Sequence, residues 1–222
     1  MSTTERPAIM HATRAALGSP WLLGVLALVV GLVGGALTSF GQSVLTGGWH
    51  ALVNSASPWV MIAFLVGLGA RGRWPRAVVA GLVSQVGLVV GYYATSELRG
   101  FAAGMSAVVI WVVASLVAGP AYGAAGALLA DRRRRVRSVA AGVPGSVWVM
   151  EGAHFFSLAS AANSHSGPGT TAGWCFIAVG VVLPLILARS LRDRLWALLT
   201  LAVCGALATG AMTLIDVAFT LG

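Results

Sequence analysis

The chain has 222 residues, of which 58% are hydrophobic and only 9% are charged, and its mean hydropathy is +0.88. So little charged surface excludes a water-soluble globular domain and predicts an integral membrane protein surrounded by the lipid bilayer. The net charge of +8 comes from 14 arginines against six acidic residues. Because the arginines lie between apolar segments and not in one patch with aromatic residues, they indicate membrane topology and no nucleic-acid binding.

Seven apolar segments of about 20 residues each predict seven membrane-spanning helices. The polar segment before them differs from a secretory signal, because the apolar run that follows it is about twice the usual length for a signal. We therefore expect an all-α fold with a cytoplasmic N-terminal segment over 1–19 and a single seven-helix membrane domain over 20–222. The expected spans are 20–45, 52–70, 76–97, 104–130, 138–160, 173–188 and 194–219.

The distribution of arginine predicts how the bundle is oriented. Seven spans place the two termini on opposite sides, and of the 14 arginines only Arg99 then lies apart from the rest. By the positive-inside rule the N-terminus is cytoplasmic and the C-terminus is outside, in a multi-pass protein of the bacterial cytoplasmic (inner) membrane. Tryptophans that fit the role of membrane anchors are Trp21, Trp74 and Trp196 at the inner boundary and Trp49 and Trp174 at the outer one.

Glycines at small-xxx-small spacing predict that helix backbones approach one another closely. The pairs are Gly31 with Gly35, Gly87 with Gly91, and Gly119 with Gly123. We expect these glycines to pack helices together and not to bind a ligand.

Glu151 is the acidic residue that topology explains least. It lies about 20 Å along its helix from Ser138, at 1.5 Å per residue, which places it in the outer half of a hydrocarbon core about 30 Å thick. A carboxyl group there is costly and marks a functional site by default. Other polar residues expected in the same outer half are Gln42, Asn54, Glu97, His154 and Asp216, whereas Asp131 and Asp193 adjoin arginines of the inner loops and balance their charge.

Helix spacing gathers further side chains around Glu151. Trp148, His154, Phe155 and Leu158 share its face, and this predicts a pocket, because a lipid-facing surface does not tolerate Glu and His together. The acids also have simpler roles open to them: Glu151 as a hydrogen-bonded link between helices, Glu97 as a partner of Arg99, and Asp216 as an interfacial residue. The other polar faces are Thr38 with Gln42, Tyr93 with Glu97, and Thr209, Thr213 and Thr220 with Asp216.

The predicted pocket suits acid chemistry on a lipophilic substrate. Burial disfavours the ionised form of a carboxyl group, so we expect Glu151 to hold a proton and act as a general acid. Asp216 or Glu97 would polarise that acid or accept the final proton. Aromatic faces would stabilise a passing carbocation; the residues expected to line the path and bind the substrate are Trp148, Phe155, Tyr92, Tyr93, His154, Gln42, Asn54 and Thr213.

Two other functions use the same residues. Glu151 could bind and release a proton while a small solute crosses the membrane, as in a proton-coupled transporter or the substrate-binding component of an uptake system. The chain could also be a structural or regulatory membrane protein without turnover. No oligomeric state is predicted.

The sequence lacks the motifs of other enzyme classes. The sequence contains no HExxH, CxxC, GxSxG or P-loop pattern, so we expect neither a metal nor a cofactor. Cys175 and Cys204 fit packing positions, and His165 falls in a glycine-rich outer loop over 164–171, where we expect no functional role.

Several strings carry a resemblance: Gly35 to Gln42 (GALTSFGQ), Asn54-Ser55 followed by Trp59, Gly91-Tyr92-Tyr93 followed by Arg99-Gly100, and Glu151-Gly152. Together they resemble a family of small, uncharacterised actinobacterial integral membrane proteins, from about the first span to the seventh. In size, span number and intramembrane acids the chain is also similar to the integral membrane terpene cyclases of meroterpenoid and indole-sesquiterpenoid pathways. That resemblance implies an isomerase or lyase of terpenoid biosynthesis that protonates an olefin or epoxide, with Glu151 and Asp216 as its acids. A competing resemblance is to the vitamin-binding components of bacterial uptake transporters, which usually cross six times.

Overall fold

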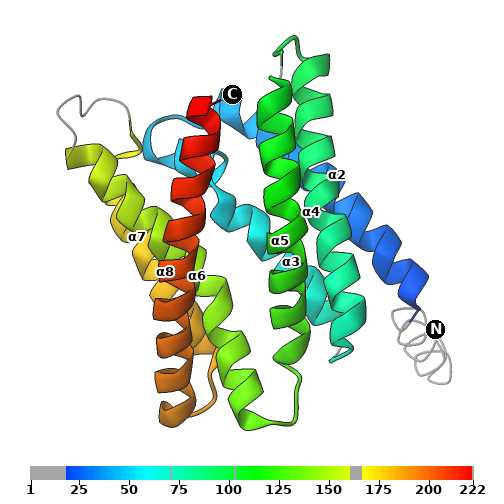
Figure 1. Ribbon diagram of the computed structural model, residues 1–222, viewed down its shortest axis with the longest axis vertical. Coiled ribbons are helices and arrows are strands. Elements are labelled where there is room, and N and C mark those ends of the chain that lie inside the picture. The colour runs from blue at the N-terminus through cyan, green and yellow to red at the C-terminus, as the bar shows by residue number, and fades with distance from the viewer. Residues whose placement is uncertain (1–18, 71, 103, 161–166, 222) are drawn as a thin grey trace, which may run out of the picture.

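The structure, a computed structural model, describes residues 19–70, 72–102, 104–160 and 167–221, and every regular element within these ranges is a helix (Figure 1). A short 3-10 helix, η1, lies between the first two α-helices. The elements in chain order are α2 (Pro20–Val44), η1 (Gly47–Leu52), α3 (Ala56–Gly69), α4 (Trp74–Leu98), α5 (Met105–Leu128), α6 (Arg134–Ser160), α7 (Gly169–Leu187) and α8 (Leu191–Leu221). The N-terminal segment predicted over 1–19 lies outside the described residues except for Ser19.

Five of these helices, namely α2, α4, α5, α7 and α8, are long and apolar enough to cross a membrane. The structure is thus that of a multi-pass helical membrane protein. α3 is also apolar but has only 14 residues, because the predicted span over 52–70 begins later than expected, after η1 and the helix-capping Ser55. α6 has 27 residues, but arginines in its first turn and Glu151 and His154 further along make it less apolar than the other long helices.

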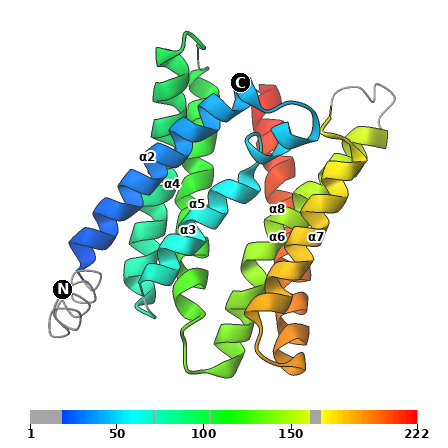
Figure 2. The same cartoon turned by 180° about the vertical axis from the view of Figure 1, so that it is seen from behind.

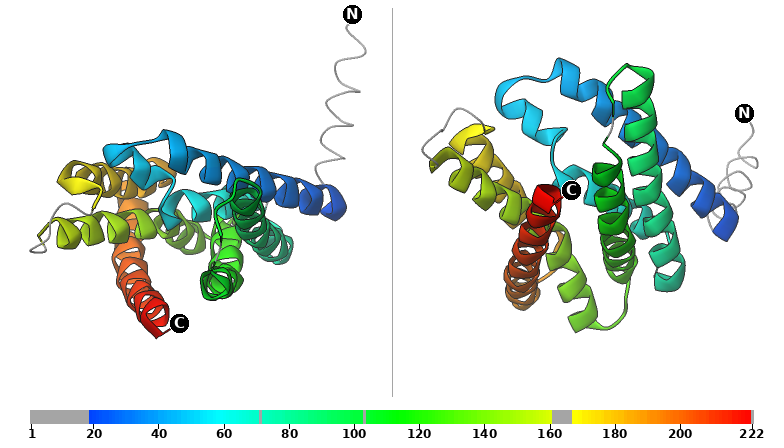
Figure 3. Two further views of the ribbon diagram at one scale, coloured as in Figure 1. Left: turned by 90° about the horizontal axis from the view of Figure 1, so that it is seen from above. Right: turned by 45° about the horizontal axis from the view of Figure 1, so that its top comes forward.

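The helices form two groups. In the first, α4 packs against α2, α5 and α3, and α3 also packs against α5; in the second, α6 packs between α7 and α8. Contacts between the groups are fewer and run from α3 and α5 to α6, from η1 to α7 and from α5 to α8. Figures 1 and 2 show α6, α7 and α8 side by side, with α3 starting near α6 and running diagonally across the α4–α5 pair. α2 and α8 lie on opposite sides of the bundle (Figure 3).

Glycines set the close spacing inside the first group, as their positions in the sequence predict. A Cβ atom at Gly31 would collide with the backbone oxygen of Ser84 on α4, and one at Gly91 would collide with that of Leu32 on α2. Gly123 of α5 faces the backbone of Ala77 on α4 in the same way. Only a residue without a side chain permits this approach.

The second group uses the same device. Gly145 of α6 faces the carbonyl oxygen of Gly180 on α7, and Gly152, next to Glu151, faces that of Gly173. The position of Glu151 relative to α7 is therefore fixed by backbone contact on both sides of it.

Charge balance organises the arginine-rich end of the bundle, as expected for Asp131 and Asp193. Asp193 is buried and accepts hydrogen bonds from Arg134 (2.6 Å) and from the hydroxyls of Ser138 and Ser190 (2.8 Å each). The backbone N–H of Asp193 in turn donates to Ser190 Oγ at 3.3 Å, which makes a reciprocal cap at the start of α8. Asp131 pairs with Arg133 at 3.3 Å, and this guanidinium lowers the pKa of the Asp131 carboxyl group.

Candidate functional site

Glu151 lies within α6 with only 5% of its surface exposed, and its carboxyl group meets the N-terminal end of α3. The backbone N–H of Ala56 donates to Oε1 at 2.7 Å, and that of Ser57 donates to Oε2 at 2.9 Å. The hydroxyls of Ser55 and Ser57 both donate to Oε2 as well. Four hydrogen bonds therefore join one side chain of the second helix group to a helix end of the first.

The sequence at the start of α3 explains why it needs this partner. The first N–H groups of any helix lack acceptors within the helix, and here the capping Ser55 accepts a bond only from Ser57 N, at 3.3 Å. A capping box would place an acid at the third helical position, but Pro58 stands there and the first turn has no acidic residue. Glu151 supplies the missing acceptor from another helix, and a negative charge at a helix N-terminus is favourable.

This arrangement is the hydrogen-bonded link between helices that the sequence allowed as a simpler role for Glu151. The carboxyl group binds two backbone N–H groups and two hydroxyls of the α3 start. The general-acid role of Glu151 stays a prediction.

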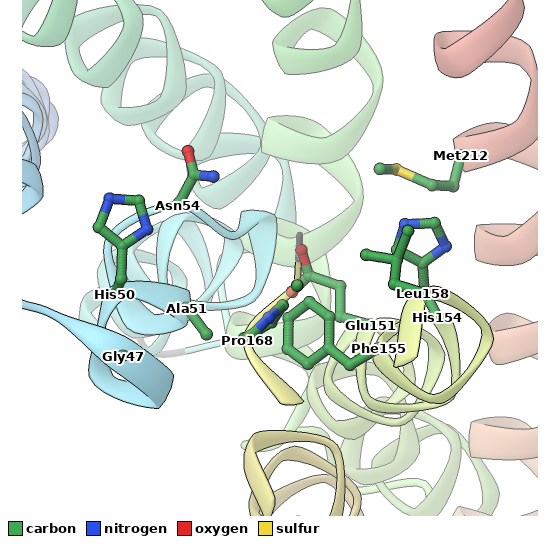
Figure 4. A pocket seen from close by; sticks show the side chains of 11 residues that line it. Gly47, His50, Ala51, Asn54, Glu151, His154, Phe155, Leu158, Pro168 and Met212 are labelled. Carbon is green, nitrogen blue, oxygen red and sulfur yellow. The ribbon is translucent and has the colours of Figure 1, made fainter. Parts of the chain in front are cut away.

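A cavity of about 570 Å³ lies beside the Glu151 carboxyl group. From the second helix group, α6 contributes Glu151, His154, Phe155 and Leu158, which are four residues of the helix face on which the pocket was predicted. In Figure 4 His50 and Asn54 stand on one side of this cavity and His154 and Met212 on the other, with Glu151 and Phe155 between them. The remaining lining residues are Gly47, Ala51, Gly167 and Pro168.

A second cavity of about 440 Å³ adjoins the first, because His50 and Asn54 line both. Its polar wall is a chain of hydrogen bonds: Tyr92 Oη donates to Gln42 Oε1 at 2.8 Å, and Gln42 Nε2 donates to Asn54 Oδ1 at 3.2 Å. Other residues of its lining are Ser39, Ser43, Tyr93, Ser96, Arg99, Phe101 and Ala102.

Arg99 supplies a positive charge to this second cavity. Its guanidinium donates to Ser39 and Ser43 and lies 4.7 Å from the centre of the Phe40 ring and 5.2 Å from that of Phe101. Aromatic faces stabilise a cation held in this way. Over the residues that the structure describes, Arg99 forms no ion pair with Glu97, so the simpler role suggested for Glu97 is absent here.

The predicted site residues are divided between several places. Glu151, His154 and Phe155 line the first cavity, Gln42, Tyr92 and Tyr93 line the second, and Asn54 lines both. The four residues that line neither are Trp148, Glu97, Thr213 and Asp216.

Each of these four has different surroundings. Trp148 packs against Phe176, with ring centres 4.9 Å apart, and its buried Nε1 has no hydrogen-bond partner among the described residues. Glu97 and Asp216 are exposed, and so is Thr213, whose hydroxyl donates to Thr209 O at 2.7 Å within α8.

Sequence reasoning missed Ser55 and Ser57 as partners of Glu151, and also His50 and Met212. The two serines carried a usable signal, because a Ser-x-Ser-Pro sequence before an apolar run is typical of a helix start. A helix start that lacks an acid in its first turn and an acid without an arginine partner, within the same membrane protein, are natural partners. His50 and Met212 gave no such signal.

Within the described ranges no three His, Cys, Asp or Glu side chains form a group that could hold a metal ion. Cys175 is exposed and Cys204 is half-buried, and both are free thiols. His165 lies outside the residues that the structure describes.

In a comparison with known protein families, residues 14–218 match the family of unknown function DUF6518, and the chain belongs to this family. This agrees with the expected membership of an uncharacterised family. No curated protein and no solved structure matches the chain. The resemblance to terpene cyclases therefore rests on the sequence features alone.

Proposed function

Because membership of that family carries no activity, we propose a function from the site itself: the chain is a proton-coupled membrane transporter of a small solute, with Glu151 as its coupling group. The observation that carries this proposal is the link in which Glu151 of one helix group holds the end of α3 in the other, at the wall of a cavity. A coupling group has to touch both the solute site and the contact between moving parts; the position of Glu151 at a cavity wall and between the two helix groups supports this role.

Protonation of Glu151 would weaken the link. Hydrogen bonds to an ionised acceptor are roughly twice as strong as bonds between neutral groups, and a protonated carboxyl group also brings a donor of its own to a place that already has four. Apart from the Glu151 link, a hydrogen bond between Tyr122 of α5 and Ser146 of α6, at 3.1 Å, joins the two groups. Proton binding would thus loosen the contact between the groups while a solute occupies the cavities.

The cavities suit a small amphipathic solute with polar groups. Their walls combine apolar side chains such as Phe155 and Leu158 with the imidazole of His50 and the amides of Asn54 and Gln42. A few polar groups in a mostly apolar concave site are typical of small-molecule binding.

A cyclase has less support from the geometry. The aromatic residues that would line a cation path are separated, with Phe155 at the first cavity, Tyr92 and Tyr93 at the second and Trp148 at neither. Glu97 and Asp216, the proposed partner acids, line neither cavity.

For the topology, we propose seven crossings of a bacterial inner membrane, with α3 and α6 added to the five long apolar helices. The cytoplasmic side would hold the N-terminus and the loops before α4, α6 and α8, which carry most of the arginines, and the C-terminus would be outside. Arg99 and the two cavities would then face the outer side.

Reconstitution in vesicles tests the transport proposal. The chain is placed in vesicles that contain a pH-sensitive dye, and a panel of amino acids, organic cations and organic acids is added outside. We expect at least one solute to change the internal pH with the wild type and none to do so with Glu151→Gln. The matched control, Glu97→Gln, should behave as the wild type, because Glu97 is exposed and lines neither cavity.

Equal proton fluxes in the wild type and Glu151→Gln would contradict the coupling role. In a second arm, the detergent-purified protein is incubated with farnesyl-type and epoxidised polyprenyl substrates. Turnover in detergent, where there is no second compartment, would favour the cyclase and contradict the transporter proposal.

Electron-spin distance measurements test the loosening of the link itself. Spin labels are attached at Val44→Cys on α2 and Ser157→Cys on α6, both exposed positions in different groups, after removal of the two native cysteines. We expect longer distances at acidic pH than at neutral pH, because protonation weakens the link, and the same longer distances for Glu151→Gln at neutral pH. A distribution that is unchanged by both treatments would show that the link is static.

A further inference from the structure

A smaller cavity of about 230 Å³ lies at the arginine-rich end of the bundle, where α8 begins beside α6 (bottom of Figure 1). Its lining is strongly basic for its size: Arg134, Arg135, Ser138, Arg192, Asp193 and Trp196. None of these residues belongs to the two cavities near Glu151.

The charges of this lining are only partly balanced. Asp193 is paired with Arg134 at 2.6 Å, and the same arginine donates to Ser190 Oγ at 2.6 Å. Arg135 and Arg192 have no acidic partner in the described part of the chain. Three arginines against one aspartate leave the cavity with a charge of +2.

Two helix ends add to this positive charge. α6 begins at Arg134 and α8 begins at Leu191, so the cavity lies between two helix N-termini. Each N-terminus carries the positive end of a helix dipole, and its first N–H groups lack acceptors within the helix, although Ser190 caps that of Asp193. The buried Asp193 binds Arg134 and links the starts of α6 and α8 through Ser138 and Ser190. These bonds hold in place the two helix ends that carry the arginines.

We propose that this cavity binds a phosphate group. Arginine matches the geometry of phosphate oxygens, and basic pockets between helix ends at a membrane surface bind the headgroups of anionic phospholipids. The two sources of such a group are an anionic phospholipid and free phosphate. Trp196 lies one turn after Arg192 with 40% of its surface exposed, and an indole ring there fits the interface of a bilayer, so the lipid is the expected source.

Binding to the full chain is measured in nanodiscs of phosphatidylcholine with increasing phosphatidylglycerol, by native mass spectrometry and by thermal unfolding. A parallel series adds sodium phosphate in place of sodium chloride at equal ionic strength. The test variant is Arg135→Gln with Arg192→Gln. The control is Arg189→Gln with Arg194→Gln, which removes the same charge from exposed arginines of the same region that do not line the cavity.

We expect the test variant to bind phosphatidylglycerol about 30-fold more weakly than the wild type, from about 1 kcal/mol for each arginine near a membrane surface. The control should keep most of the wild-type affinity, and Arg135→Lys with Arg192→Lys should keep part of it, which shows that the fold is intact. A response to sodium phosphate that the test variant loses would assign the site to free phosphate. Equal loss in the test and control variants, or no loss in either, would overturn the proposal.

Discussion

Replacing Glu151 by Gln tests the structural account of the site most directly. Oε1 of Glu151 accepts one hydrogen bond, from Ala56 N, and Oε2 accepts three. With its amide oxygen at the Oε2 position, Gln would turn its NH₂ group toward Ala56 N–H; the opposite orientation would likewise set one backbone N–H, that of Ser57, against NH₂, because the serine hydroxyls can also accept. In either orientation one backbone N–H would face another donor, and the other three bonds would become bonds between neutral groups.

The cost follows from these four bonds. A hydrogen bond to a charged group contributes about 1.5–3 kcal/mol and a neutral one about 1 kcal/mol. One lost bond, of about 1.5–3 kcal/mol, and three bonds weakened by about 0.5–2 kcal/mol each give a loss of about 3–9 kcal/mol in the free energy of unfolding. For a chain of this size, 1 kcal/mol corresponds to a shift of about 2–4 °C in Tm, so we expect Glu151→Gln to melt on the order of 10 °C below the wild type.

The assay is thermal unfolding of the purified protein in detergent, followed by tryptophan fluorescence and by loss of the monodisperse peak in size-exclusion chromatography. Glu97→Gln carries the same chemical change at an exposed position and should stay within about 0.5 kcal/mol of the wild type. If Glu151→Gln melts with the wild type, the four hydrogen bonds do not hold α3 and the account of the link is wrong.

Three further substitutions test other contacts, each by the same unfolding assay. Ser57→Ala removes one hydroxyl donor and keeps the backbone bond to Glu151, so we expect the free energy of unfolding to fall by about 1–2 kcal/mol. A decrease equal to that of Glu151→Gln would contradict the view that all four hydrogen bonds contribute to stability. Gly126→Ala puts a Cβ against the backbone oxygen of Phe64 and should lower Tm, whereas Gly24→Ala, which has open space around its Cβ position, should leave it unchanged or raise it; the same shift for both would argue against backbone contact between α3 and α5. Asp193→Asn breaks the pair with Arg134 and should lower Tm by several degrees, more than Asp131→Asn in its exposed pair; the reverse order would show that the Asp193 contacts do not order the ends of α6 and α8.

The positions of the helices were largely predictable, because the length of an apolar run and its flanking arginines depend on the local sequence alone. The predicted 20–45 compares with Pro20–Val44, and the predicted 76–97 with Trp74–Leu98. The prediction for 52–70 was wrong at its start, because Gly47–Leu52 is a 3-10 helix and the capping Ser55 delays α3. Hydrophobicity does not distinguish a 3-10 turn from the end of a span.

Helix periodicity placed five residues of α6 on one face, and four of them line the cavity, namely Glu151, His154, Phe155 and Leu158, whereas Trp148 packs against Phe176. It did not predict what Glu151 contacts, since Ser55 and Ser57 lie 96 and 94 residues away in the chain. Depth along a helix gave no information about what lies beside Asp216. In α8 the cavity lining consists of Met212, one turn earlier, and Asp216 is exposed.

The dependence of α3 on Glu151 has a consequence for biogenesis. During synthesis α3 leaves the ribosome well before α6 exists, so two backbone N–H groups and two hydroxyls at its start lack their acceptor until α6 has been made. A chain that stops before α6 would retain α2, α4 and α5 in contact through their glycines, but its α3 would have an unsatisfied end within an apolar environment. Among the N-terminal helices it is therefore α3 that gains its full set of hydrogen bonds only after α6 arrives, and we expect quality control of truncated chains to recognise α3 first.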